Sequence, residues 1–324
     1  MPRVSIVIPT RNAGPSFAAT LDAIATQDRP PDELLIIDSG STDGTPERAE
    51  RFGARVMAID PSAFGHGRTR NAGIAASTGD LVVLTVQDAI PADGQWLSAL
   101  VDALTAHPHA AGAYSRSLPR HGAGFIERYL ALRDTPATAG DAPIEQRWPS
   151  SERLAALSLD ELRRCCAFTD GSSILRRTVW AQCPLPDVAY AEDLAWSIAV
   201  MRRGYSIVHV PASRVYHSHH RSRWYELRRS YIDRRALLAL HANVVPPTEG
   251  FDRPAVGSGR EVQGLVRDMT ARARAEGVLT PRLWCEIRAR VLVGAVGVGL
   301  ANLAARRANG LWPPQFERWL AHGI

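Results

Sequence analysis

The sequence contains no lysine, so all 38 of its basic side chains are arginines. The absence of lysine excludes a lysine nucleophile and a Schiff-base intermediate from the chemistry of the protein. Contacts between a basic side chain and an anion must instead come from the forked guanidinium group, which matches phosphate and carboxylate geometry. The formal net charge is +5 over 324 residues. A basic balance of this size suits phosphates, acidic lipids or nucleic acid, and charge alone does not choose among them.

Cysteine is also scarce. The four cysteines, Cys165, Cys166, Cys183 and Cys285, show no C-x-x-C spacing, which argues against a redox motif. We interpret the adjacent pair Cys165–Cys166 as part of a packed core. The first ten residues, MPRVSIVIPT, lack the charged and then apolar pattern of a secretory signal. These features predict a reduced protein in the cytoplasm.

Three common motifs of nucleotide-binding proteins and hydrolases are missing. The first apolar run leads into PTRNAG instead of G-x-G-x-x-G, and neither G-x-x-x-x-G-K-[ST] nor G-x-S-x-G occurs. These absences exclude a dinucleotide-binding dehydrogenase, a P-loop protein and the usual α/β-hydrolase. Nucleic-acid binding is supported only by the pI of about 9.3, and we do not expect it.

The first part of the chain alternates apolar, β-branched runs with amphipathic stretches. The runs predict strands over 4–10, 33–40, 54–60 and 81–86, and a helix over 16–27. This alternation predicts an α/β fold with a mostly parallel sheet. Ligands bind such sheets beyond the carboxyl ends of the strands. Polar residues gather at those ends, namely Thr10–Asn12, Asp38–Ser41 and Gln87–Asp88.

The later part of the chain is less regular. Residues 112–150 show a weak pattern, and residues 135–151 read as a loop. Regular structure returns with an amphipathic helix over 191–205 and a strand over 206–211. After residue 240, a proline- and glycine-rich linker (244–261) precedes arginine-studded helices. The sequence thus predicts a domain over 1–240 and a helical C-terminal extension over 241–324.

One segment of this extension is strongly apolar. The run VLVGAVGVGLANLAA (291–305) has arginines on both sides and is shorter than the roughly 20 residues of a bilayer-spanning helix. We expect a buried helix. The alternative is an interfacial helix that gives the protein a peripheral membrane contact.

Four segments occur in a specific order: VSIVIPTRN (4–12), LLIIDSGSTDGT (34–45), FGHGRTRN through QDAIP (64–91), and YAEDLAW through YHSH (190–219). Over roughly residues 3–235, this set resembles glycosyltransferase family 2. The resemblance implies the GT-A nucleotide-sugar-binding fold and an inverting glycosyltransferase. DSGSTDGT, HGRTRN, QDA and HSH are most similar to bacterial rhamnosyltransferases, which use dTDP-L-rhamnose to build O-antigen and other surface polysaccharides.

Two alternatives remain open within this resemblance. The same fold can use a UDP-sugar donor, and the chain can instead be a non-catalytic nucleotide-sugar-binding subunit of a polysaccharide assembly complex. The expected partners are a nucleotide-diphosphate sugar and a saccharide or lipid-linked acceptor. The oligomeric state is left open.

The resemblance also implies a divalent cation, Mg²⁺ or Mn²⁺. Most family members end the fourth strand in a D-x-D motif, whose last carboxylate matches Asp88. Val86 and Gln87 stand where the other acid would be. A hard cation prefers several oxygen ligands, so we expect weak binding, with His217 as a second ligand.

Further roles follow from the same motifs. On the donor side, the resemblance implies contacts from Thr10, Arg11, Asn12, Asp38, Ser39, Arg68, Arg70, Asn71 and Gln87. Ser39 departs from the family pattern, in which a second aspartate recognises the base. We expect GHGRTRN (65–71) to be a glycine-rich loop in front of a helix, where Arg68 or Arg70 is apt for bidentate contact with the diphosphate.

For the chemical step, the resemblance implies that Asp193 is the general base. Inversion in one displacement needs a carboxylate that accepts the proton of the attacking hydroxyl. Glu192 would position the acceptor or Asp193, at a helix start where the macrodipole favours negative charge. Asp170 and Gly171 would line the acceptor side.

Overall fold

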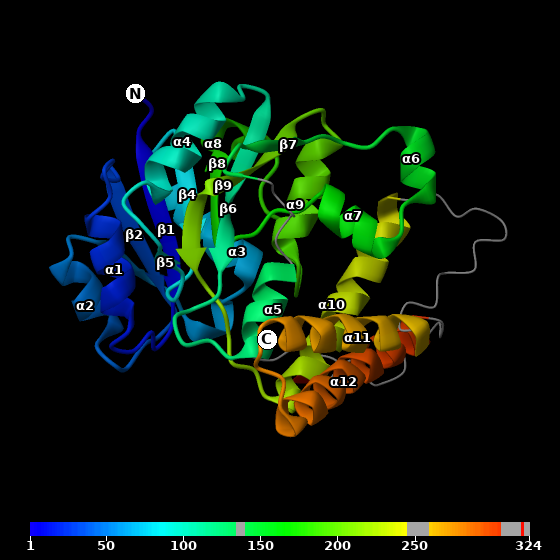
Figure 1. The fold of residues 1–324 in the computed structure, drawn as a ribbon. Helices are drawn as coiled ribbons and strands as arrows, with labels where there is room; N and C mark the ends of the chain where they lie inside the picture. Colours follow the sequence, from blue (N-terminus) through cyan, green and yellow to red (C-terminus); the bar gives the residue numbers. More distant parts are fainter. Residues whose placement is uncertain (134–139, 245–258, 306–318, 321–324) are drawn as a thin grey trace. The chain divides into compact units, whose positions relative to one another are not determined.

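The computed structural model describes residues 1–133, 140–244, 259–305 and 319–320 (Figure 1). The chain divides into two compact units, each described here by itself. The first comprises residues 1–121, 131–149 and 163–218, and the second comprises 122–130, 150–162 and 219–324. The boundary after residue 240 stays a prediction. It lies within helix α10 (Arg223–Val244), which belongs to the second unit. The predicted linker lies almost entirely outside the described residues.

A nine-stranded sheet forms the centre of the first unit (Figure 1). Its strands are β1 (Val4–Thr10), β2 (Glu33–Asp38), β3 (Arg55–Ala58), β4 (Leu81–Thr85), β5 (Ile90–Pro91), β6 (Ala110–Leu118), β7 (Ile144–Gln146), β8 (Ser172–Arg176) and β9 (Ser206–Tyr216). The order is β3-β2-β1-β4-β8-β6-β9-β5, with β7 paired to β9. The pairs β1–β2, β1–β4, β2–β3 and β6–β9 are parallel, whereas β8 runs antiparallel to β4 and β6. The predicted α/β fold with a mostly parallel sheet is confirmed.

Helices cover both faces of this sheet, because alternate residues of a strand point to opposite sides. On one face, β1 joins α1 (Phe17–Ala25) and α4 (Trp96–Ala106) in a core that includes Val4, Ile6, Ile8, Phe17, Leu21 and Leu100. On the other face lies α3 (His66–Ala76). A Cβ added to Gly73 of α3 would lie 2.4 Å from Cγ1 of Val7, so this helix packs directly on the strand.

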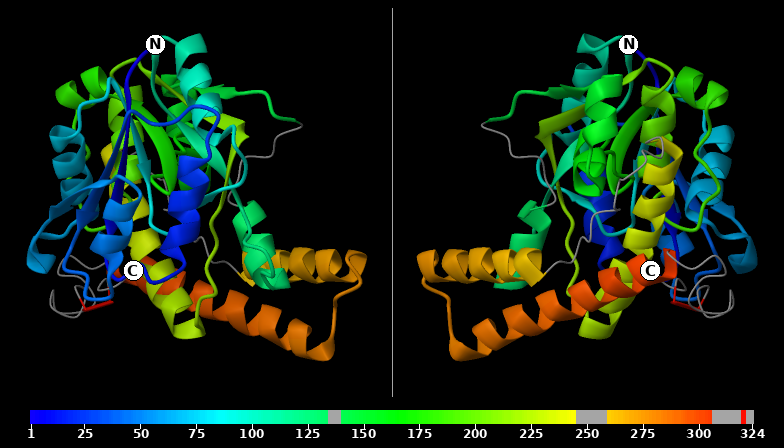
Figure 2. Two further views of the ribbon diagram at one scale, coloured as in Figure 1. Left: turned by 90° about the vertical axis from the view of Figure 1, so that its left-hand side faces the viewer. Right: turned by 90° about the vertical axis from the view of Figure 1, so that its right-hand side faces the viewer.

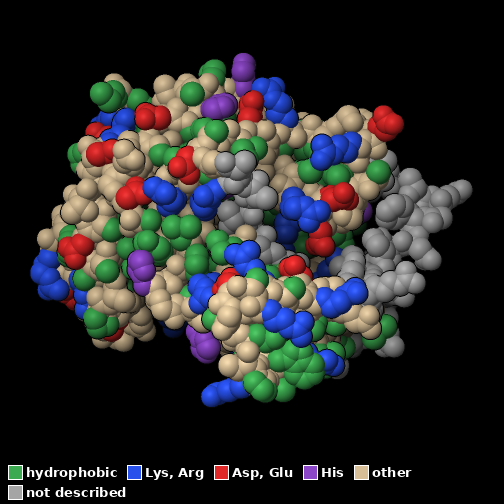
Figure 3. All heavy atoms as spheres, in the orientation of Figure 1, with side chains coloured by type: hydrophobic (Ala, Val, Ile, Leu, Met, Phe, Trp, Pro, Cys, Tyr) green, Lys and Arg blue, Asp and Glu red, His purple; other side chains and the backbone are tan. Residues whose placement is uncertain are grey.

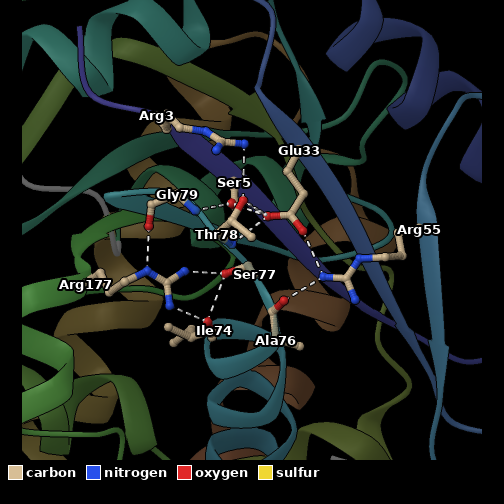
Figure 4. A network of polar contacts seen from close by, with 10 residues as sticks. All are labelled: Arg3, Ser5, Glu33, Arg55, Ile74, Ala76, Ser77, Thr78, Gly79 and Arg177. Carbon is tan, nitrogen blue, oxygen red and sulfur yellow. Dashed lines mark hydrogen bonds and ion pairs between the residues drawn. The ribbon is translucent and has the colours of Figure 1, made fainter.

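A polar network closes the edge of the sheet where β1 and β2 begin (Figure 4). The Glu33 carboxylate accepts hydrogen bonds from the Ser5 hydroxyl at 2.6 Å and the Thr78 amide at 2.7 Å, and pairs with Arg55 at 2.8 Å. Burial alone would raise the pKa of Glu33, but these donors outweigh it and lower the pKa to about 2. At the C-terminal end of α3, the Arg177 guanidinium donates hydrogen bonds to the carbonyls of Ile74 and Gly79 and to the hydroxyl of Ser77. The network fixes the edge opposite to the strand ends that the sequence marks as a site.

Residues 112–150, where the sequence pattern is weak, contain regular elements, and the predicted loop over 135–151 is interrupted by β7. The structure has most of β6, helix α5 (Phe125–Arg133) and β7 in this range, while residues 134–139 lie outside the described part. The sequence of β6, AAGAYSRSL, contains no β-branched residue and is rich in alanine and serine. Its strand conformation is stabilised by pairing with β8 and β9. Such pairing between distant segments cannot be predicted from the β-propensity of the local sequence.

The described residues of the second unit are mainly helical. They include α10, α11 (Gly259–Ala275), α12 (Pro281–Ala305), α6 (Ser151–Ala156), most of α5 and the first part of α7 (Leu159–Cys165). The paired helices α11 and α12 lie side by side in both views of Figure 2. Their core contains Phe125, Ile126, Met269, Ala273, Ile287 and Val291. Helices α10 and α12 approach closely at Gly297, where an added Cβ would lie 2.5 Å from the carbonyl oxygen of Leu227.

Helix α12 contains the apolar run for which a buried helix was expected, and this expectation is only partly correct. Val291, Ala301 and Ala304 are buried, but Leu292, Val296 and Leu303 are 59%, 45% and 44% exposed. Within the described ranges, α12 is the one helix long and apolar enough to cross a membrane by length and composition. Core helices of soluble proteins share that property.

Candidate active site

The carboxyl ends of β1 and β2 meet in register, with Thr10 beside Asp38. The buried Asp38 carboxylate accepts hydrogen bonds from the Thr10 hydroxyl at 3.0 Å and from the Ser41 hydroxyl at 2.5 Å. Its other oxygen accepts the amides of Gly40 and Ser41 at 3.1 and 2.8 Å. The Ser39 hydroxyl donates to the Thr10 carbonyl at 3.0 Å. Asp38 and Ser39 thus shape the turn after β2, and their predicted contacts with the donor stay predictions.

The segment after β1 is held from two sides. Asn12 adopts a positive φ of 46°, and its side-chain oxygen accepts the Thr42 amide at 2.8 Å. Gln87 accepts the Arg11 amide at 2.9 Å and donates to the Arg11 carbonyl at 3.5 Å. An amide side chain both donates and accepts, which a carboxylate does not do. This double contact gives Gln87 a structural role directly before Asp88.

Asp88 lies between a guanidinium and an imidazole. One carboxylate oxygen pairs with Nη2 of Arg120 at 2.7 Å, and the other lies 3.6 Å from Nε2 of His217. The same Arg120 nitrogen donates to the Asp88 carbonyl at 3.0 Å. The side chains of Asp88, Arg120 and His217 are 34%, 39% and 23% exposed, so ligands can reach them. The structure brings together both predicted metal ligands.

Strand pairing explains how these three residues meet. Ile90 of β5 pairs with Tyr216 of β9, and Leu118 of β6 pairs with the same residue. His217 therefore follows β9 beside the segment that carries Asp88. The His217 amide donates to the Leu118 carbonyl at 2.9 Å, and the Arg120 amide donates to the Ser218 hydroxyl at 3.0 Å. Arg120 was not predicted from the sequence, because it lies outside every motif and reaches Asp88 only through this pairing.

The chemistry of Asp88 and His217 fits a divalent cation. Carboxylate oxygens suit Mg²⁺ and Mn²⁺, and imidazole is a common ligand of transition metals. Two ligands at about 2.1 Å from one ion can lie up to about 4.2 Å apart, which admits the 3.6 Å separation seen here. His219 follows two residues after His217 in the sequence and is a further candidate ligand. The ion pair with Arg120 competes with a cation for Asp88, which agrees with weak binding.

A second cluster of acids lies at the start of α9 (Glu192–Met201). Arg70 of α3 pairs with Asp170 at 3.2 Å and with Glu192 at 3.0 Å, and all three side chains are less than 10% exposed. Asp193 is half-buried beside Glu192 and accepts the Leu194 amide at 2.7 Å. Ala191, which precedes the pair, has a φ of 60°, a strained conformation for alanine. The structure thus brings together the predicted base, its neighbour and the acceptor-side aspartate.

Three carboxylates share one guanidinium in this cluster, so full ionisation would leave a buried net charge of −2. Burial has the largest influence on Asp170 and raises its pKa to about 8; Arg70 lowers this pKa, and the nearby Asp193 and Glu192 raise it. Burial, followed by repulsion from Glu192, raises the pKa of Asp193 to about 6. The pKa values of both carboxyl groups are therefore raised, that of Asp170 more than that of Asp193. A carboxylate with a pKa near 6 is well matched to general-base catalysis.

The HGRTRN segment is helical, whereas we expected a loop in front of the helix. Helix α3 begins at His66, so Arg70 lies one turn inside it and faces Glu192. The close approach depends on Gly67, since an added Cβ would lie 2.2 Å from the carbonyl oxygen of Pro186. Asn71 donates to the Leu185 carbonyl at 2.8 Å. These contacts position the segment before α9, and donor contacts from Arg70 and Asn71 stay predictions.

Arg68 differs from its neighbours on α3. Its side chain is 57% exposed and lies 3.3 Å from the equally exposed Asp187. An exposed pair of this kind contributes little to stability. Arg68 is therefore the arginine of HGRTRN that can turn towards an anionic ligand at low cost.

Gly171 connects the two clusters. Gly171 directly follows Asp170 of the acid cluster, and its carbonyl accepts the Thr85 hydroxyl at 3.0 Å at the end of β4. A Cβ added to Gly171 would lie 3.4 Å from Nδ1 of His217. The acid cluster and the Asp88–His217 pair are therefore neighbours at one edge of the sheet. One side holds three carboxyl groups around Arg70, and the other pairs a carboxylate with an imidazole.

Comparison with known proteins agrees with this architecture. The family model "Glycosyl transferase family 2" matches residues 5–156. The O-antigen chain rhamnosyltransferase WbaN of Salmonella anatum is 30% identical over 223 residues, which are 68% of this chain and 67% of that protein. The O-antigen chain rhamnosyltransferase RfbN of Salmonella typhimurium is 29% identical over 221 residues, 67% of each chain. The chain belongs to glycosyltransferase family 2 and is a glycosyltransferase.

A solved structure supports the fold independently. The mannosyltransferase PcManGT from Pyrobaculum calidifontis, in complex with GDP-Man and Mn²⁺, superposes with a TM-score of 0.58 at 19% identity. The match covers 92% of this chain and 87% of that one. The predicted GT-A fold is confirmed.

Proposed function

We propose that this glycosyltransferase moves L-rhamnose from dTDP-L-rhamnose to a saccharide or lipid-linked saccharide of a surface polysaccharide, with inversion at the anomeric carbon. The proposed setting is the cytoplasm. The Salmonella relatives support the sugar and the product class, since they match two thirds of the chain. The observation that carries the proposal is the proximity of the acid cluster to the Asp88–His217 pair: Gly171 follows Asp170, and a Cβ added to it would lie 3.4 Å from Nδ1 of His217.

In the proposed mechanism, the acceptor hydroxyl attacks the anomeric carbon while its proton passes to Asp193. The bond between that carbon and the diphosphate oxygen breaks, and the diphosphate leaves with the electron pair. Glu192 is held by Arg70 at 3.0 Å and positions Asp193 and the acceptor. Because Arg70 is buried among these acids, we propose that it positions them. Thr10, Arg11, Asn12 and Arg68 are the proposed donor contacts.

Asp88 and His217 are the proposed ligands of Mg²⁺ or Mn²⁺. A bound cation would neutralise charge that develops on the leaving diphosphate. Arg120 holds Asp88 in place from the other side, through its bonds to the carboxylate and the carbonyl. The guanidinium supplies a second positive charge beside the same carboxylate.

Calorimetry with a panel of nucleotides tests the donor. We expect dTDP and dTDP-L-rhamnose to bind more tightly than UDP or GDP and their sugars. A clear preference for a UDP sugar would replace the proposed donor and leave the family assignment intact. Mn²⁺ titrations with and without dTDP test the metal ligands, because mutual strengthening must be reciprocal. Loss of that coupling in Asp88→Ala is the expected result, and unchanged coupling would contradict the assignment.

A further inference from the structure

Helix α12 presents an unusual surface for a helix of a soluble protein. Residues 291–305 contain one polar side chain, Asn302, and it accepts a hydrogen bond from Nε of Arg234 on α10 at 2.9 Å. The rest of this stretch is apolar on every side. A helix on a protein surface normally has charged or polar residues on its outer face. That outer polarity is missing here.

The exposed residues of this stretch lie on one side of the helix. Leu292, Val296 and Leu303 are separated by four and seven residues, a spacing that places them along one face. Val293, Ala295, Val298 and Leu300 are half-buried around them. We call these seven residues the α12 apolar face. Only 28% of the most apolar 18-residue window of α12 is buried within the protein, so the face is largely uncovered.

Basic and aromatic side chains accompany this face. Arg282 and Arg288 are exposed on the first turns of α12, and the Arg288 guanidinium lies over the Trp284 ring at 4.5 Å. Trp224 and Trp319 are also about half exposed, with ring centroids 6.0 Å apart. Figure 3 shows arginine and apolar side chains interleaved over α11 and α12. Tryptophan and arginine beside apolar surface are typical of groups that sit among lipid headgroups.

The charge of the chain is strongly asymmetric. Residues 219–324 hold 17 arginines and 9 acidic residues, a net charge of +8. Residues 1–218 hold 21 arginines and 24 acidic residues, a net charge of −3. The basic charge of the protein therefore belongs to the part that carries the α12 apolar face. A dimer joined through this face would bring two net charges of +8 close together, and they would repel each other. An anionic surface would instead attract the positive charge of each copy.

We propose that the α12 apolar face docks the protein on a bilayer that contains anionic lipids. The whole of α12 is long enough to cross a bilayer, but its uncharged run 291–305 has only 15 residues, one of them the polar Asn302. This run is shorter than the roughly 20 apolar residues of a spanning helix, so the helix lies in the plane of the interface. Leu292, Val296 and Leu303 enter the acyl boundary, and the arginines pair with lipid phosphates. The inference is independent of the donor sugar. It places the enzyme where a lipid-linked acceptor would be found.

Flotation of the full-length protein with phosphatidylglycerol-containing vesicles tests this inference. The wild type should float at low salt, and should float less at high salt or with neutral phosphatidylcholine vesicles. The pair Leu292→Gln and Val296→Gln leaves the net charge unchanged. We expect it to weaken vesicle partitioning at least about tenfold, since two exposed apolar side chains are lost from the interface.

The matched control is the pair Leu132→Gln and Val188→Gln, at residues that are 49% and 40% exposed outside α12. It should float like the wild type. Equal flotation of the two pairs, or no flotation of the wild type at low salt, would overturn the proposal. The proposal would also be overturned if the wild type were a dimer that does not float, and if Leu292→Gln together with Val296→Gln converted this dimer into a monomer. Calorimetry with dTDP on the same samples shows whether the donor site is intact, so failure of membrane docking is separable from failure of the proposed function.

Discussion

Three carboxylates and one guanidinium share a buried space at the start of α9. Arg70 fixes Asp170 and Glu192, and this leaves Asp193 as the acid that is both half-exposed and free of a direct ion pair with the guanidinium. Burial raises the pKa of Asp170 more than that of Asp193. Such an arrangement allows Asp193 to be a carboxylate at neutral pH without a large buried net charge.

The first prediction concerns the pH dependence of turnover. Because the pKa of Asp193 is raised to about 6, the fraction of deprotonated base falls as the pH decreases through 6. Turnover at saturating donor should fall with it and level off above pH 7. Asp193→Asn should reduce turnover at neutral pH by at least about a hundredfold and leave dTDP binding unchanged. A flat profile between pH 5 and 7 would show that another group accepts the proton.

A second prediction concerns Arg120. Its ion pair with the half-exposed Asp88 is worth about 0.2–1 kcal/mol. Arg120→Gln should therefore tighten Mn²⁺ binding to the nucleotide-free protein by up to about fivefold in calorimetry. Arg214→Gln is the matched control, since Arg214 pairs with Asp93 at 2.9 Å and is also 39% exposed. Weaker Mn²⁺ binding in Arg120→Gln would mean that the guanidinium orients Asp88 for the cation instead of competing with it.

The elements of the sheet show where sequence reasoning succeeded and where it did not. Strands β1, β2 and β4 are continuous apolar runs, so the sequence reports both their existence and the polar residues at their ends. Strand β6 is made of small and polar residues and depends on its partners. Arg120 follows that strand, which is why no local pattern pointed to it.

Helix α3 gives the same lesson at the candidate site. The glycines of GHGRTRN were interpreted as a loop, since glycine disfavours helices. In the structure, Gly67 lies within the helix and permits its contact with Pro186. The Arg70 side chain donates to the His66 carbonyl, one helical turn earlier, at 3.1 Å. The four-residue spacing of His66 and Arg70 was the sequence signal that could have indicated a helix. The orientation of Arg70 towards Glu192 depends on the packing of α3 against the segment before α9, which the sequence does not display.

The third prediction tests this packing. Gly67→Ala places a methyl group against the Pro186 carbonyl, so α3 and the facing segment must separate. We expect a loss of about 1–3 kcal/mol in the free energy of unfolding, together with lower turnover from a displaced Glu192. Gly264→Ala on α11 is the control, because an added Cβ there meets nothing within 4 Å. It should be neutral or stabilising. Equal stability of the two variants in urea unfolding would contradict the close approach.

At the scale of the whole molecule, the chain combines a slightly acidic catalytic part with a basic, partly apolar C-terminal part. The first contains every residue proposed for donor binding, metal binding and catalysis. The second contains the α12 apolar face and most of the net positive charge. This division assigns the chemistry and the attachment to different parts of the chain. Changes on α12 should therefore alter membrane partitioning without altering dTDP affinity.

The stereochemistry of transfer tests the central claim most directly. In the proposed mechanism Asp193 acts as a base in a single displacement, so each transfer must reverse the configuration of the anomeric carbon. The measurement is NMR of the product formed from dTDP-L-rhamnose and a saccharide acceptor, with the anomeric configurations of donor and product compared. The account predicts opposite configurations, and no product above background with Asp193→Asn. A product with the donor's configuration, or undiminished transfer by Asp193→Asn, would contradict it.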